Sequence, residues 1–74
     1  MIMAVQCKMA RAALGWGVRD VAKAAGVNVN TVSRFEGGQN VTISTIERIR
    51  AAFEAAGVKF LKNGGVEPPK ENED

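Results

Sequence analysis

Apolar residues recur three and four positions apart along most of the chain, a spacing that predicts amphipathic helices. In the first segment Cys7, Ala10 and Leu14 share one face, and Gly15 follows as a stop. The second segment covers residues 18–25, ends at Gly26 and turns these apolar residues inward: Val18, Val21, Ala22 and Ala25. The pattern therefore predicts two short helices before the chain reaches its first ambiguous stretch.

The stretch VNVNTVSRFEGG, residues 27–38, fits two structures. Its first residues alternate between Val and Asn, as in a half-buried strand, whereas Val32 and Phe35 fit the buried stripe of a helix. The link before it, residues 26–28, is too short to reverse the chain into a sheet. A link of that length suits two helices that meet at a large angle, so a helix is favoured.

The ends of this third helix can also be predicted. Asn28 suits an N-cap, and the glycine pair at 37–38 suits a stop, which gives a helix from about Val29 to Glu36. This helix buries Val32 and Phe35. It exposes a polar set made of Asn30, Thr31, Ser33 and Arg34.

A fourth helix has a start signal at residues 44–47. Their sequence Ser-Thr-Ile-Glu fits a capping box, in which the Ser hydroxyl and the Glu carboxylate each satisfy a backbone N–H at the helix start. Gly57 closes this helix, and its apolar residues recur at helical spacing: Ile46, Ile49, Phe53 and Ala56.

The segment VKFLK, residues 58–62, is the one good strand candidate, because Val58 and Phe60 alternate with Lys59. A lone strand leaves backbone groups unpaired, so we expect it to pair with another edge, for which a second copy of the chain is one candidate. Residues 63–74 are polar and rich in Gly and Pro, which predicts a flexible, disordered acidic tail. The division is thus a folded domain at 1–62 and a tail at 63–74.

Composition narrows the class of protein. The 74 residues are 46% apolar but include only three Phe, one Trp and no Tyr, a core typical of small all-α domains. The absence of His and the single cysteine, Cys7, exclude a zinc finger, an imidazole base and an internal disulfide. We therefore expect no enzyme, no cofactor and no metal, and a protein of the reducing cytoplasm.

Targeting signals are not apparent in the sequence. Lys8 and Arg11 interrupt the first residues where a signal peptide needs a continuous apolar run. No segment approaches the length of a membrane span, so the chain is expected to be soluble and unprocessed.

Charge is distributed unevenly. Residues 1–61 hold eight Lys and Arg against four Asp and Glu, a net +4, whereas residues 62–74 hold two against four, a net −2. A basic domain is compatible with nucleic acid as partner, although this charge alone does not identify one.

The segment VRDVAKAAGVNVNTVSRFEGG resembles the helix-turn-helix of lambdoid phage repressors, Cro and Xre-type transcription regulators. With RAALGWG before it and TIERIRAAFEAAGVKF after it, the similarity extends from about Cys7 to Phe60. Ala22 stands where two helices cross closely, and Gly26 where the turn needs positive φ. The resemblance implies an all-α, lambda-repressor-like bundle of four to five helices that binds double-stranded DNA as a homodimeric repressor on a near-palindromic operator.

The same resemblance assigns candidate DNA-binding residues. Those at base-reading positions are Val29, Asn30, Ser33 and Arg34, while Asn28 and Thr31 lie nearer the DNA backbone. Asn30 can pair with adenine, Arg34 with guanine, and Val29 can contact a thymine methyl. Gln39, Asn40 and Thr42 are candidate phosphate donors, and Arg19, Lys8 and Lys23 can add positive charge.

Two departures from the family pattern bear on this assignment. Where many members have Ser or Thr followed by Gln, this chain has Gly17-Val18, so a contact between Val18 and Val29 is expected in place of an amide pair. The loop GGQNVTIS, residues 37–44, carries no charge, so binding should depend only weakly on salt. Arg11 and Glu36, in contrast, match a family pair that ties the first helix to the end of the third.

Other roles remain open at this stage. The same fold serves protein-interaction modules such as antitoxins or anti-repressors, with a toxin as partner, and the uncharged loop also allows a vestigial DNA surface. For the dimer we favour the end of the fourth helix and the strand, because Val58, Phe60 and Leu61 are more apolar than a free edge should be. Trp16 is expected in the core, at the junction of the first two helices.

Overall fold

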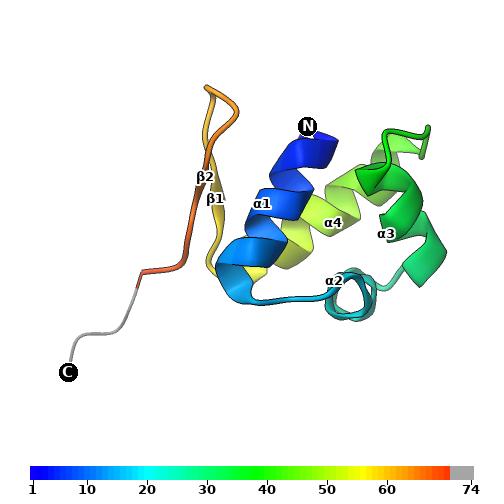
Figure 1. Ribbon diagram of the computed structural model, residues 1–74, viewed down its shortest axis with the longest axis horizontal. Helices are drawn as coiled ribbons and strands as arrows, with labels where there is room; N and C mark the ends of the chain where they lie inside the picture. The colour runs from blue at the N-terminus through cyan, green and yellow to red at the C-terminus, as the bar shows by residue number, and fades with distance from the viewer. Residues whose placement is uncertain (71–74) are drawn as a thin grey trace.

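The computed structural model describes residues 1–70, and the part of the predicted tail at residues 71–74 lies outside them. The described chain forms four helices followed by a two-stranded sheet (Figure 1). The elements in chain order are α1 (Ala4–Leu14), α2 (Val18–Ala25), α3 (Val29–Glu36), α4 (Ile43–Ala55), β1 (Lys59–Phe60) and β2 (Val66–Glu67). In Figure 1 the hairpin of β1 and β2 lies on one side of α1, and α2 and α3 lie on the other.

The predicted third helix is confirmed, and so is its N-cap. The Asn28 side-chain oxygen accepts a hydrogen bond from the Asn30 backbone N–H at 2.8 Å. This bond satisfies one of the N–H groups that a helix start leaves without a partner. The alternation that suggested a strand therefore has a local explanation, since one of its asparagines is a cap.

The predicted capping box at residues 44–47 is wrong. Helix α4 begins at Ile43, and its cap is Thr42, whose hydroxyl accepts from the Thr45 N–H at 3.3 Å. Glu47 turns instead toward Arg50, at 2.9 Å between Oε1 and Nη2. The chain offers two hydroxyl residues two positions apart, Thr42 and Ser44, and the one that lengthens the helix by two residues is used.

All four helices end in the same arrangement. A glycine of positive φ follows the last turn, its N–H donates to the carbonyl three residues back, and the next N–H donates to the carbonyl five residues back. This is the Schellman motif, which satisfies carbonyls that a helix end leaves free. The glycines are Gly15, Gly26, Gly38 and Gly57, and the residues after them are Trp16, Val27, Gln39 and Val58.

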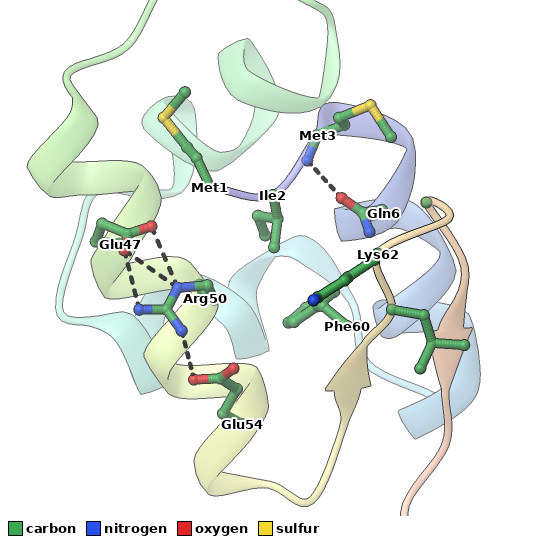
Figure 2. Close-up of a pocket in the computed structure, with 11 residues that line it drawn as sticks. Met1, Ile2, Met3, Gln6, Glu47, Arg50, Glu54, Phe60 and Lys62 are labelled. Atoms are coloured by element: carbon green, nitrogen blue, oxygen red, sulfur yellow. Dashed lines mark hydrogen bonds and ion pairs between the residues drawn. The ribbon is translucent and has the colours of Figure 1, made fainter.

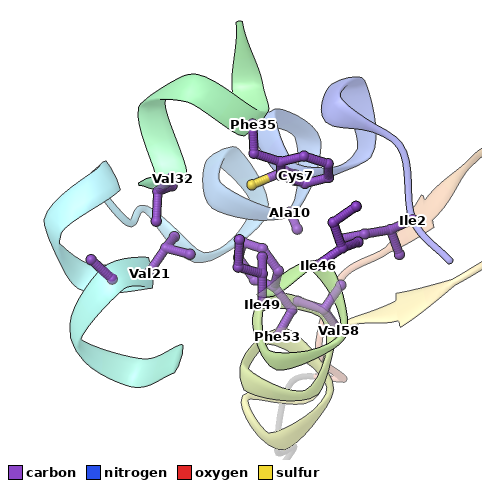
Figure 3. Packing of buried hydrophobic residues seen from close by; sticks show 11 residues of the cluster. Ile2, Cys7, Ala10, Val21, Val32, Phe35, Ile46, Ile49, Phe53 and Val58 are labelled. Atoms are coloured by element: carbon purple, nitrogen blue, oxygen red, sulfur yellow. The ribbon is translucent and has the colours of Figure 1, made fainter. Parts of the chain in front are cut away.

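The core joins α1, α2, α3, α4 and the chain entering β1 (Figure 3). Its largest fully buried side chains are Phe53, Ile49, Val21, Val32 and Cys7. Trp16 packs against this cluster as predicted and stacks on Phe53, with 5.8 Å between ring centroids. Phe60 meets Phe53 edge-on at 6.0 Å, which anchors the hairpin on α4.

The expectation of a strand without a partner in its own chain is wrong. β1 pairs antiparallel with β2, with Lys59 opposite Glu67 and Phe60 opposite Val66. β2 lies within the residues for which a flexible tail was expected. The segment 63–65 acts as a turn, in which the Asn63 side chain accepts from the Gly65 N–H at 2.8 Å. The second edge that β1 needs is therefore supplied by β2, which begins six residues after β1 ends.

Candidate nucleic-acid interface

The turn between α2 and α3 fixes the angle at which the two helices meet. Gly26 has a φ of 68°, a conformation that residues with a Cβ rarely adopt, and the Val27 N–H donates to the Ala22 carbonyl at 3.0 Å. Ala22 is buried, and α2 packs on both α3 and α4. The positive φ predicted for Gly26 is thus confirmed, whereas a close helix crossing at Ala22 stays a prediction that its burial is consistent with.

Helix α3 has one buried face and one polar face. Val32 and Phe35 are buried, while Asn30, Ser33 and Arg34 are exposed and Thr31 is half-buried. The backbone therefore presents to solvent most of the polar side chains that the sequence predicted there.

Val18 and Val29 occupy the two positions where the family pattern has amides. Both are half-buried and pack against the core cluster. The direct contact between them stays a prediction. Neither valine can replace the polar contact to DNA that an amide would make at these positions.

The charged and polar residues proposed for the DNA backbone lie at the surface. Lys8, Arg19 and Lys23 are exposed, as are Gln39, Asn40 and Thr42. A hollow of about 500 Å³ separates α3 from the start of α4, and its lining residues are Thr31, Arg34, Asn40, Val41, Thr42 and Thr45. This places Arg34, Asn40 and Thr42 around one concave surface that combines polar and apolar lining.

Arg34 has a partner that the sequence did not indicate. Its Nε donates to the Gln39 side-chain oxygen at 3.3 Å. The Gln39 backbone N–H also donates to the Arg34 carbonyl at 2.9 Å, as part of the motif that ends α3. Arg34 and Gln39 are five positions apart on either side of the glycine pair at 37–38. In a helix that ends at such a pair, this spacing is a signal that could have indicated the contact.

The end of α3 is held by Arg11, and this predicted pair is confirmed. The guanidinium binds the Glu36 carboxylate in a forked arrangement, with Nε–Oε2 at 2.6 Å and Nη2–Oε1 at 2.8 Å. Its third nitrogen donates to the Trp16 carbonyl at 3.1 Å. Arg11 therefore ties the end of α1 to the last residue of α3 and to the link before α2.

Glu36 keeps its charge although its side chain is only 8% exposed. Burial by itself would raise the pKa of this carboxyl, but hydrogen bonds from Arg11 and Cys7 outweigh it and lower the pKa. The Cys7 thiol donates to Oε2 at 3.1 Å, a contact that the sequence did not reveal. Burial, reinforced by the neighbouring carboxylate, raises the pKa of Cys7 far above its ordinary value, so the thiol stays protonated and remains a donor.

A second hollow lies away from α3, between the N-terminus, α4 and the hairpin (Figure 2). Its volume is about 540 Å³, and Met1, Ile2, Met3 and Phe60 contribute apolar lining. On its α4 side Arg50 bridges Glu47 and Glu54. No sequence pattern predicted a cavity there.

No helix within residues 1–70 combines the length and the apolar character that crossing a lipid bilayer requires. Comparison with curated proteins and with solved structures found no match. Comparison with protein families found one, to the family described as "Helix-turn-helix domain", over residues 2–59. That range includes all four helices and ends in β1. The chain therefore belongs to the helix-turn-helix domain family, of the Xre and lambda-repressor-like type, whose motif is used to bind DNA.

Proposed function

We propose that this chain is a sequence-specific transcription regulator, acting as a homodimeric repressor that inserts α3 into the major groove of DNA. The observation that carries the proposal is the division of α3 into a buried apolar face and an exposed polar face directly after the Gly26 turn. In the helix-turn-helix the second helix enters the groove and its first residues reach the base edges. Here those residues are Val29, Asn30, Ser33 and Arg34.

Each of these side chains suits a different base contact. The Asn30 amide can donate to and accept from adenine, and the Arg34 guanidinium can donate twice to guanine. Val29 can touch a thymine methyl, while Ser33 can donate or accept. The mixture favours a defined base sequence over general affinity for duplex DNA.

Backbone contacts position such a helix without reading sequence. We assign them to Asn28 and Thr31 beside the bases, to Gln39 and Asn40 in the loop, and to Arg19 on α2. Because most of these are neutral, few phosphates are neutralised, and log K should fall by only about 0.9 per charged phosphate contact per decade of salt. A shallow salt dependence is thus part of the proposal.

A homodimer follows from the small number of bases that one helix can read. Two copies would place their α3 helices about 34 Å apart on a near-palindromic site. The surface first favoured for this contact is less suitable, since Val58 is buried and β1 pairs within the chain. Large apolar side chains are instead exposed at the N-terminus and at the start of α4: Met1, Met3, Val5, Met9 and Ile43.

Selection of DNA sequences tests the function. The full chain is mixed with random-sequence duplexes at low salt, and the retained pool is sequenced. An enriched, two-fold related site is expected, and Arg34→Ala should lose preference at one base pair of each half-site. If no site is enriched and Arg34→Ala changes nothing, the chain does not read DNA in this way.

A second candidate function is suggested by the same exposed apolar side chains, since a surface of this kind often binds another protein. An antitoxin or anti-repressor would use it to hold a partner of a different sequence. Sedimentation in the absence of DNA separates the two cases. A dimer that weakens in Ile43→Ser supports self-association, whereas a monomer at high concentration favours a foreign partner.

A further inference from the structure

The side chains of Arg34 and Gln39 are brought together by the way α3 ends. Gly38 has a φ of 80°, its N–H donates to the Phe35 carbonyl, and the Gln39 N–H donates to the Arg34 carbonyl. A Schellman motif places these two residues, one in the last turn and one just after it, side by side. Their side chains then meet directly, with 3.3 Å between the Arg34 Nε and the Gln39 Oε1.

In the other three described helices, the residue after the terminal glycine packs in the core instead of contacting a polar side chain with its own side chain. There the residue after the glycine is Trp16, Val27 or Val58, each of which packs on the apolar core or belongs to it. A contact between apolar side chains is the usual companion of this motif. Gln39 is exposed and contributes nothing to the core, and among the four described helix ends it alone uses its own side chain to accept a hydrogen bond from a polar side chain of the helix it follows. At the end of α1 the corresponding residue, Trp16, accepts from Arg11 through its backbone carbonyl.

The geometry decides which part of Arg34 stays available. The hydrogen bond occupies Nε, and within residues 1–70 the two terminal nitrogens have no hydrogen-bond partner. A guanidinium is planar, so fixing one N–H fixes the plane of the other donors. A side chain held before binding loses less freedom on binding, which strengthens the contact with the base that suits it.

We propose that Gln39 is a specificity-determining positioning residue, which holds the Arg34 guanidinium so that its two terminal nitrogens meet a guanine in the major groove. The inference rests on the proposed function and gives Gln39 a role in base choice beyond a phosphate contact. Its amide NH₂ remains free to donate to the DNA backbone at the same time.

The test is a set of variants measured on the selected operator and on operators changed at the base pair that Arg34 reads. Gln39→Met keeps an unbranched side chain of similar length but removes the acceptor. Arg34→Ala and the double variant Arg34→Ala with Gln39→Met complete a cycle. Asn40→Ala is the matched control, because Asn40 is the next loop residue, is exposed and has no hydrogen bond to Arg34.

The wild type should prefer guanine over the other bases at this position by about 5- to 150-fold, the range of a bidentate arginine contact. Gln39→Met should reduce that preference about two- to fivefold, the size of an exposed hydrogen bond to a charged group, and leave preferences at other positions unchanged. In the Arg34→Ala background the same change should have no effect on base preference. Asn40→Ala should weaken all operators alike, and melting curves should show each variant folded.

Failure of the inference is distinguishable from failure of the function. If the wild type selects a site and Arg34→Ala loses one base preference, but Gln39→Met retains it, the inference is wrong and the function stands. Equal effects of Gln39→Met with and without Arg34 would reduce Gln39 to a phosphate contact. If the wild type selects no site, both the proposed function and the inference about Gln39 are wrong.

Discussion

The molecule contains two arginine–glutamate arrangements that differ in position and in their expected contribution to the free energy of unfolding. Arg11 joins Glu36 across elements 25 residues apart, and the two side chains are 25% and 8% exposed. Arg50 joins Glu47 and Glu54 within α4, and these three side chains are 35%, 40% and 45% exposed. Arg50 makes four hydrogen bonds to carboxylates, whereas Arg11 makes two.

The number of bonds is therefore a poor guide to their effect. The Arg50 bonds join residues that the helix already holds close, and water competes for every atom. The Arg11 bonds join residues that are distant in sequence. If either partner were removed, the remaining charge would be unpaired and poorly solvated. Stability should follow burial and sequence separation rather than the count of contacts.

The largest expected effect comes from removing the buried pair's cation. Arg11→Ala should lower the free energy of unfolding by about 3 kcal/mol, because the Glu36 carboxylate stays buried with only the Cys7 thiol as donor. Urea unfolding followed by circular dichroism measures this. Adding Glu36→Gln to the variant should recover part of the loss, since no buried charge then remains. A double variant less stable than Arg11→Ala would contradict this explanation.

The pH dependence of that loss is the next test. The folded-state pKa of Glu36 is lowered from its ordinary value of 4.5, so its contribution to stability is fully present above pH 4.5 and is lost as pH falls through the folded-state pKa. The difference in stability between wild type and Arg11→Ala should therefore be widest above pH 4.5 and narrow as the solution is acidified. A difference that stays constant down to the acid transition would mean that charge is not responsible.

A smaller effect is expected at Cys7, which contacts Glu36 from the core side. Cys7→Ala should cost about 1–2 kcal/mol, through a lost hydrogen bond to a charged group and a small void. Cys7→Ser retains a donor and should cost less. The two unfolding midpoints decide between them, and a serine variant less stable than the alanine variant would show that the thiol matters through its volume.

The smallest effect is expected from the larger network. The hydrogen bond from Arg50 lowers the pKa of Glu47, yet the two side chains remain 35% and 40% exposed to water. Arg50→Ala should leave the unfolding midpoint within experimental scatter at moderate salt, and it should leave DNA affinity unchanged, because α4 presents this face away from α3. A loss comparable with that of Arg11→Ala would overturn the distinction drawn between the two arrangements.

Much of this architecture could be predicted from local signals. The caps of α3 were readable because Asn28 and the glycine pair bound a segment with two clearly buried positions, Val32 and Phe35. The Arg11–Glu36 pair was accessible only through family resemblance, since nothing local joins residues 25 apart. Local signals therefore predict the four helices and β1, and resemblance predicts one long-range contact.

The errors arose where several residues offered the same chemistry. Thr42 and Ser44 both suit a cap, and only the path of the loop decides that Thr42 accepts from the Thr45 N–H. β2 contains a single apolar residue, Val66, so its pairing depends on β1 rather than on its own pattern. The bond between Arg34 and Gln39 does not follow from the sequence, because each of these polar residues is equally suited to contact DNA.

The position of Trp16 gives the protein an optical reporter of its own assembly. It is the chain's single tryptophan, it stacks on Phe53 of α4, and its carbonyl accepts from Arg11 of α1. The indole therefore lies where the chain leaves α1 for α2, against a ring from α4. Its emission will change when α1, the link or α4 moves apart, so intrinsic fluorescence can follow the opening of this junction without any added label.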